Sequence, residues 1–308
     1  MTYFYDLTLG LPHTNHRGLS EPLLLMSAGH FQWTSIAAAT GGPLSRLRTA
    51  AGGEVYAAFY YIEERFPAST PLDGFGLDDK VRFAIKLRSF KNIAVEGRIV
   101  FDRPERLADP ARVEACLAPD AVDVPHPFIR FGNIFVTPVK GNSVLRVAPP
   151  ASADFSGITP LPNADNPYHL TRAASEGRGL GVLDDRWAPI GSFEHRYRID
   201  VDRDTNGAGL VYFANYAGFM DTAERLALAE LAPALPLGPD RLGRRSLSHR
   251  RIGYYGNADV SDTIAVRVTV LRDPESPQRL GFRYAIERDE DGQTICLSEA
   301  VKVIPLEQ

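Results

Sequence analysis

The stretch that decides the fold runs from Asp202 to Tyr216 and reads DRDTNGAGLVYFANY. It follows a strand-like segment at 192–201 and leads into an apolar, helix-like segment from about Leu210 to Leu231. That segment has large apolar side chains on one broad face and small or apolar ones around much of the rest, and a helix that is apolar almost all round is buried. The stretch therefore predicts a central helix wrapped by a sheet.

A related phrase lies near the start of the chain. Thr14-Asn15-His16-Arg17-Gly18-Leu19 shares its Thr-Asn and Gly-Leu pairs with Thr205-Asn206-Gly207-Ala208-Gly209-Leu210. It also follows a strand-like segment, at 1–9, and opens a short apolar helix from about Leu19 to Ala28. We interpret the chain as two related halves, each with a polar Thr-Asn pair before a helix N-terminus.

Strand-like segments follow each predicted helix. We place them at 54–63, 81–90, 93–102 and 127–136 in the first half, and at 250–256, 263–272, 279–288 and 293–304 in the second. The stretch 137–191 is rich in proline and glycine and is too long for an ordinary loop, which favours a packed connector. Strand, helix and then a run of strands is an α+β order. We expect an N-terminal domain at 1–140, a connector at 141–190 and a C-terminal domain at 191–308.

Composition and charge narrow the possible partners and the compartment. The 308 residues are 44% hydrophobic, and 34 basic against 38 acidic residues leave a formal charge of -4, so no general attraction to nucleic acid or anionic lipid is expected. No apolar run reaches the ~18 residues that span a bilayer. The two cysteines lack metal or redox spacing and the first residues do not form a leader, which favours the cytoplasm. His13 and His16 have no further ligands at a suitable spacing, so no metal is expected.

The stretch that begins at Asp202 resembles the signature of the hotdog-fold acyl-CoA thioesterases of the 4-hydroxybenzoyl-CoA type. The resemblance implies two tandem hotdog folds, each a central helix wrapped by an antiparallel sheet. In that family the position of Asn206 is usually the catalytic Asp and that of Phe213 often a His, and neither residue here can act as a base. Without that acid and histidine, the loop and helix start can still hold a thioester carbonyl, through the helix N–H groups and the Thr-Asn pair. The same pair can also simply cap the helix.

A narrower resemblance rests on three segments, Phe59-Tyr60-Tyr61, the run from Asp204 to Ala214, and Tyr255-Gly256-Asn257-Ala258-Asp259. Together they resemble the double-hotdog acyltransferase/decarboxylase family of polyketide biosynthesis, to which the bifunctional enzyme of the leinamycin pathway belongs. The resemblance implies that the protein accepts methylmalonyl-CoA, passes the acyl group through a tyrosine and delivers propionyl to an acyl carrier protein. The implied reaction requires no metal or organic cofactor, and the acyl-CoA is its substrate. We expect a homodimer.

The resemblance places the family's tyrosine on the strand at 54–63, where Tyr60 fits best and Tyr56, on the same face by alternation, is the reserve candidate. A phenol has a reference pKa near 10, so it needs a neighbouring cation or donor to act as a nucleophile. Loss of carbon dioxide leaves an enolate that Asn206 or Asn15 can stabilise. The predicted catalytic residues are therefore Tyr60, Tyr56 and Asn206, and the predicted substrate-binding residues are Thr14, Asn15, Gly18, Thr205, Gly209 and Leu210.

Two other functions fit the same residues. A thioesterase or dehydratase acting on an acyl-CoA or a carrier-bound polyketide would need an acid or base near a Thr-Asn loop, and His13, His16 and Glu21 are the only such groups in the first copy. A non-catalytic carrier-binding module would bind without transfer.

Overall fold

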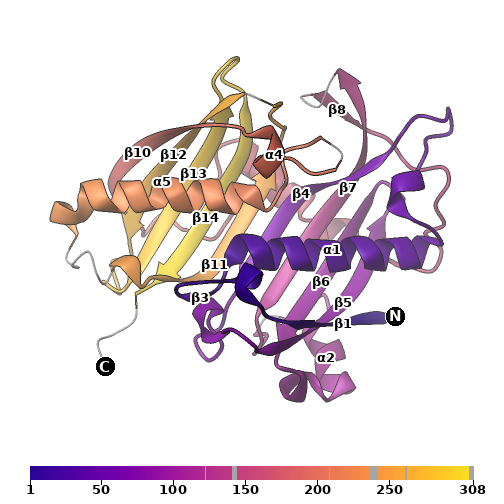
Figure 1. Ribbon diagram of the computed structural model, residues 1–308, viewed down its shortest axis with the longest axis horizontal. Coiled ribbons are helices and arrows are strands. Elements are labelled where there is room, and N and C mark those ends of the chain that lie inside the picture. Colours follow the sequence, from indigo (N-terminus) through magenta and orange to yellow (C-terminus); the bar gives the residue numbers. More distant parts are fainter. Residues whose placement is uncertain (122, 141–143, 208, 236–241, 261, 305–308) are drawn as a thin grey trace. The chain divides into compact units, whose positions relative to one another are not determined.

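The computed structural model describes residues 1–121, 123–140, 144–207, 209–235, 242–260 and 262–304. The chain forms two compact units, and the division between 169 and 170 falls inside the segment expected to connect two domains. Each unit has one long helix lying along an antiparallel sheet (Figure 1). The expected α+β class is confirmed.

The sheet of unit 1 has the strand order β1-β5-β6-β7-β4, with every neighbouring pair antiparallel. The four strands expected between 54 and 136 are confirmed. The bounds are β1 Thr2–Thr8, β4 Tyr56–Arg65, β5 Lys80–Phe90, β6 Ala94–Asp102 and β7 Phe128–Lys140. Two short strands extend this sheet, β8 (Val144–Val147) beside β7 and β9 (Thr159–Pro160) parallel to β5, while β2 (Thr14–Asn15) and β3 (Gly18–Leu19) form a separate hairpin.

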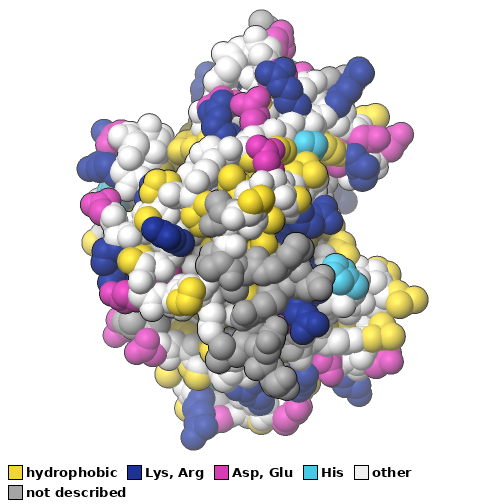
Figure 2. All heavy atoms as spheres, turned by 90° about the vertical axis from the view of Figure 1, so that its left-hand side faces the viewer, with side chains coloured by type: hydrophobic (Ala, Val, Ile, Leu, Met, Phe, Trp, Pro, Cys, Tyr) yellow, Lys and Arg dark blue, Asp and Glu magenta, His cyan; other side chains and the backbone are white. Residues whose placement is uncertain are grey.

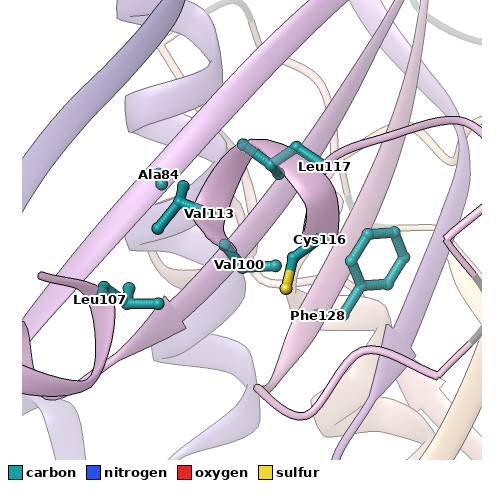
Figure 3. Close-up of a cluster of buried hydrophobic side chains, with 7 residues drawn as sticks. All are labelled: Ala84, Val100, Leu107, Val113, Cys116, Leu117 and Phe128. Carbon is teal, nitrogen blue, oxygen red and sulfur yellow. The ribbon is translucent and has the colours of Figure 1, made fainter. Parts of the chain in front are cut away.

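The long helix of unit 1, α1, runs from Glu21 to Thr40 and is twice as long as expected. The helix continues through Gly29 and ends at Gly41, whose φ of 82° provides the left-handed cap that ends many helices. On the face of the sheet opposite α1, the short helix α2 (Pro110–Cys116) packs its Val113 and Cys116 against the strands. Figure 3 shows the cluster, which comprises Ala84, Val100, Leu107, Val113, Cys116, Leu117 and Phe128.

The sheet of unit 2 has the order β11-β14-β13-β12-β10. The expected strands are confirmed, with bounds β10 Ala188–Arg198, β11 Ser246–Tyr254, β12 Thr263–Arg272, β13 Arg279–Arg288 and β14 Thr294–Val303. The shorter helices are α3 (Tyr168–Ser175), where the two units meet in the sequence, and α4 (Val201–Asp204). Short 3₁₀ turns occur at Leu11–His13, Leu44–Arg46, Leu72–Gly74, Pro104–Leu107, Asn163–Asp165 and Ala232–Ala234.

The long helix of unit 2, α5, begins at Asn215 and ends at Leu231. The expectation that this helix starts at Leu210 is therefore wrong. Residues 205–207 and 209–214 lie outside the helix, because Thr205 bridges to Val211 and the Tyr212 N–H donates to the Asp204 carbonyl at 2.7 Å. Gly209, with a φ of 73°, supplies the left-handed residue that such a tight loop needs.

Candidate functional site

Tyr60 lies at an irregularity in strand β4. The pairing of β4 with β7 passes from Phe59 opposite Asn133 to Tyr61 opposite Gly132, so Tyr60 is one extra residue. Such a bulge turns a side chain away from the regular alternation, and bulges are common beside active sites. The Tyr60 ring lies over Gly132, where a Cβ atom would be 2.7 Å from the ring atoms Cε1 and Cζ. Only glycine leaves room for the ring there.

The register of the strands shows which face of the sheet Tyr60 occupies. Gln32 of α1 lies against Gly97 and donates to the Asn133 side chain at 3.1 Å, so these two strand residues face α1. Gly132 precedes Asn133, and successive residues of a strand point to opposite faces. Tyr60, stacked on Gly132, therefore lies on the face opposite α1.

The Tyr60 hydroxyl is held by a residue 106 positions away in the sequence. Its Oη donates to Oδ1 of Asn166 at 3.0 Å, and both side chains are buried. The same Oδ1 accepts the backbone N–H of Tyr168 at 3.0 Å, which fixes the orientation of the amide. The phenol thus has one defined hydrogen-bond acceptor.

A buried group of charges lies beside this pair. Glu96 accepts from Arg88 Nη2 at 2.6 Å through one oxygen and from Arg130 Nε at 2.5 Å through the other. Arg130 also donates to the backbone carbonyl of Asp165, and Arg88 reaches the Asp165 carboxylate at 3.4 Å. The two arginines therefore tie the residue before Asn166 to the sheet.

These surroundings keep the phenol protonated. Burial raises the pKa of Tyr60 well above its ordinary value, the Glu96 carboxylate raises it further, and Arg130 acts in the opposite direction. Desolvation disfavours a phenolate. In this arrangement Tyr60 is a neutral hydrogen-bond donor, and any reaction at Oη has to remove the proton as the new bond forms.

The reserve candidate, Tyr56, has a different environment on the same face. It lies opposite Val136, four residues along β7 from Gly132, so the expectation that Tyr56 and Tyr60 share a face is confirmed. Its hydroxyl donates to Oε2 of Glu54 at 3.0 Å at an exposed position. That hydrogen bond raises the pKa of Tyr56, with a smaller effect from burial.

The first Thr-Asn phrase does not lie directly at a helix N-terminus. Thr14 and Asn15 form β2 of the small hairpin, Gly18 belongs to β3, and Ser20 is the residue before α1. Asn15 is exposed, and its Oδ1 accepts the Arg17 N–H at 2.8 Å. Gly18 has a φ of 127°, and a Cβ atom there would be 2.8 Å from the Phe75 carbonyl oxygen. The phrase leads into α1, whereas Tyr60 lies on the opposite face of the sheet.

The second phrase closes on itself. The Asn206 N–H donates to the Leu210 carbonyl at 2.8 Å, Asn206 Oδ1 accepts the Leu210 N–H at 3.2 Å, and the Gly209 N–H donates to the Asn206 carbonyl at 2.8 Å. Thr205 donates from Oγ1 to the Val201 carbonyl of α4 at 2.7 Å. The residue that caps α5 is Ala214, so the alternative in which Thr205 and Asn206 cap this helix is also wrong.

The sequence gives no role to Asp204, the acidic residue beside this loop. Asp204 is 3% exposed, and its Oδ2 accepts from the Tyr197 hydroxyl at 2.7 Å and from the Asp200 N–H at 2.8 Å. Burial and this carboxylate raise the pKa of Tyr197 to about 12. The Asp204 carboxylate thus anchors the start of the loop that carries Asn206.

We also searched the described residues for a metal site, a membrane-spanning helix and a charged surface patch. In the described part of the chain, no three His, Cys, Asp or Glu side chains are grouped to hold a metal ion, and no helix is long and apolar enough to cross a bilayer. Figure 2 shows basic and acidic side chains interspersed over the face it draws, consistent with 34 basic and 38 acidic residues.

Comparisons with known proteins find similarity in structure alone, since no protein-family model and no curated protein matches the sequence. An oleoyl thioesterase structure from Lactobacillus plantarum is 12% identical, with a TM-score of 0.66 over 100% of this chain and 98% of that one. A 12:0-ACP thioesterase from Umbellularia californica is 9% identical, with a TM-score of 0.60 over 98% and 96%. An acyl-ACP thioesterase from Bacteroides thetaiotaomicron is 8% identical, with a TM-score of 0.54 over 98% and 97%. The chain has the fold of these thioesterases, an α+β architecture of two tandem hotdog folds.

Proposed function

We propose that the protein is an acyl-thioester enzyme that removes carbon dioxide from a malonyl-type acyl-CoA, methylmalonyl-CoA first, and delivers the propionyl group to an acyl carrier protein. The resemblance of the segments around Tyr60 and Asn206 to the double-hotdog acyltransferase/decarboxylases supports it. The fold supports thioester chemistry in general, because three proteins that share it are thioesterases by description, two of them for acyl groups on a carrier protein.

The observation that carries the proposal is the buried and oriented Tyr60 hydroxyl. Oη is fixed by Asn166 at 3.0 Å beside the cationic Arg130, whereas the Tyr56 hydroxyl lies at an exposed position. A fixed reacting group lowers the entropy cost of reaction, and Arg130 partly offsets the burial and the Glu96 charge that disfavour a phenolate. Tyr60 is therefore the better of the two tyrosines for acyl transfer.

The transfer consists of balanced steps. Oη attacks the thioester carbonyl carbon, the new C–O bond replaces the C–S bond, and the phenol proton leaves with the coenzyme A thiol. Cleavage of the bond to the carboxylate releases carbon dioxide, and the enolate takes up one proton to give propionyl. The carrier thiol then takes the propionyl group and returns its proton to Oη.

The test is to incubate the protein with methylmalonyl-CoA and a carrier protein and to weigh both proteins by intact mass spectrometry. We expect propionyl on the carrier, and a rate that falls more than about 10²-fold in Tyr60→Phe, because the nucleophile and its transferable proton are lost. Tyr56→Phe removes the other phenol of the same face and should keep the rate within about twofold. The proposal is wrong if Tyr60→Phe transfers propionyl as fast as the unaltered protein.

Thioester hydrolysis is the second candidate, because the three proteins of the same fold are thioesterases by description. It would yield free acid and leave the carrier unacylated in the same assay. A dehydratase would instead remove water from a 3-hydroxyacyl carrier, and a carrier-binding module would bind the carrier with no change in its mass.

A further inference from the structure

The Tyr60 hydroxyl depends on a residue outside its own sheet. Asn166 follows a 3₁₀ turn (Asn163–Asp165) that crosses the face opposite α1, and its Oδ1 accepts both the Tyr60 hydroxyl and the Tyr168 N–H at 3.0 Å. The Asn166 N–H in turn donates to the Asn163 carbonyl at 3.2 Å. The amide is therefore fixed from both its backbone and its side chain.

The turn is fixed to the sheet as well. Arg130 donates to the Asp165 carbonyl, Arg88 reaches the Asp165 carboxylate at 3.4 Å, and Glu96 orients both arginines. Arg88 and Glu96 are 6% and 1% exposed, so these contacts form where charged hydrogen bonds are strong. The Asn166 amide is thus held both by its own hydrogen bonds and by the anchored turn before it, which fixes the direction of the Tyr60 hydroxyl proton.

We infer that Asn166 is a positioning residue for the Tyr60 hydroxyl in acyl transfer, held in place by the Arg88–Glu96–Arg130 cluster through Asp165. This inference rests on the proposed function. Asn166 holds the hydroxyl proton on one side of Oη and leaves the oxygen lone pairs directed elsewhere. Its neutral amide also keeps the phenol protonated without adding a charge, because an amide oxygen accepts a hydrogen bond but cannot take the proton at neutral pH.

Two substitutions of Asn166 have opposite effects on the Tyr60 phenol. Asn166→Ala removes an acceptor that stabilises the neutral phenol, which should raise its ionisation constant about tenfold. Asn166→Asp keeps an acceptor of the same shape but adds a negative charge, which should lower that constant. The other charged groups that act on the phenol, Glu96 and Arg130, are present in both variants.

The readout is the titration of 3,5-difluorotyrosine in place of tyrosine, whose phenol ionises at lower pH, followed by ¹⁹F NMR with the Tyr60 signal assigned from Tyr60→Phe. In the same variants kcat and KM for propionyl transfer are measured. For Asn166→Ala we expect kcat to fall on the order of 10- to 100-fold with KM within about twofold, because misplacing a reacting group lowers the rate of the bound complex. Asn163→Ala, at an exposed position of the same turn, is the matched control and should change neither quantity.

The outcomes separate this inference from the proposed function. If Asn166→Ala leaves both kcat and the Tyr60 titration unchanged, or if both variants shift the titration in the same direction, the positioning role is wrong. If the unaltered protein transfers no acyl group, the proposed function fails. The titrations then still decide whether Asn166 controls the Tyr60 hydroxyl.

Discussion

Replacing Gly132 by alanine tests whether the position of Tyr60 matters. The new Cβ atom would lie 2.7 Å from Cε1 and Cζ of the Tyr60 ring and 3.0 Å from Oη. An ordinary contact begins at 3.4 Å, so the rigid ring has to move by at least about 0.7 Å. A shift of that size weakens the 3.0 Å hydrogen bond to Asn166, because the hydroxyl moves with the ring.

The expected cost has three contributions. Overpacking costs about 1–3 kcal/mol, the weakened hydrogen bond about 1 kcal/mol, and alanine regains about 0.5–1 kcal/mol over glycine in a strand. The free energy of unfolding of unit 1 should therefore fall by about 1–3 kcal/mol. The rate of propionyl transfer should fall further than this loss implies, on the order of 10²-fold, because a displacement near 1 Å misaligns a reacting group.

The assay combines urea unfolding with the rate of carrier acylation. Gly157→Ala is the matched control, because no atom lies within 4 Å of the Cβ it would add. In a Tyr60→Ala background the destabilisation by Gly132→Ala should disappear, since the clashing ring is gone. A Gly132→Ala protein that is as stable and as active as the unaltered protein would show that the position of the Tyr60 ring does not matter.

Two further predictions concern the buried charges of unit 2. Glu224→Gln should lower the free energy of unfolding by about 3–5 kcal/mol, because the substitution leaves the cations of Lys302 and Arg245 in the core without this carboxylate. Urea unfolding measures this loss. The control is Glu230→Gln, at an exposed position of the same helix, which should have no effect. Burial alone would raise the pKa of Glu224, but Lys302 and then Arg245 more than offset this, so the pKa is lowered on folding. The stabilisation is therefore fully present above about pH 4.3, the pKa of a glutamate in the unfolded chain. It is lost as the pH falls through the lower pKa that Glu224 has in the folded protein. Unfolding free energies measured between pH 7 and pH 3 should drop in the acid range, and less steeply in Glu224→Gln; a drop of equal size in both proteins would contradict the role of this carboxylate.

The strands were predictable because their patterns are local. Residues 263–270 place a large β-branched apolar side chain at every second position and form most of β12. The helix ends were harder. Gly29 favours an early end of α1, but the helix continues through it to the capping Gly41. The loop contacts of Thr205 and Tyr212 place the start of α5 at Asn215.

The site depended on features that no local pattern shows. Strict alternation puts Tyr61 on the face opposite to Tyr60, but the bulge turns both toward Gly132. Asn166 was hidden in a connector rich in turn-forming residues, because its contact with Tyr60 joins residues 106 positions apart. Such contacts follow from packing and not from sequence spacing.

The repeated Thr-Asn phrase shows a similar limit. It identified two related halves, each with a long helix on a sheet. The two copies nevertheless differ in structure, since the first is a hairpin and the second a closed loop. Shared residues therefore indicated a shared fold and not two equivalent sites.

Acyl transfer through Tyr60 is best tested by the mass of an acyl carrier protein after incubation with the protein and methylmalonyl-CoA labelled with ¹³C in its methyl group. Acyl transfer with decarboxylation predicts a carrier that gains one labelled propionyl group, at a rate that falls more than about 10²-fold in Tyr60→Phe and stays within about twofold in Tyr56→Phe. A carrier that gains intact methylmalonyl, or an unmodified carrier with labelled free acid in solution, would contradict it.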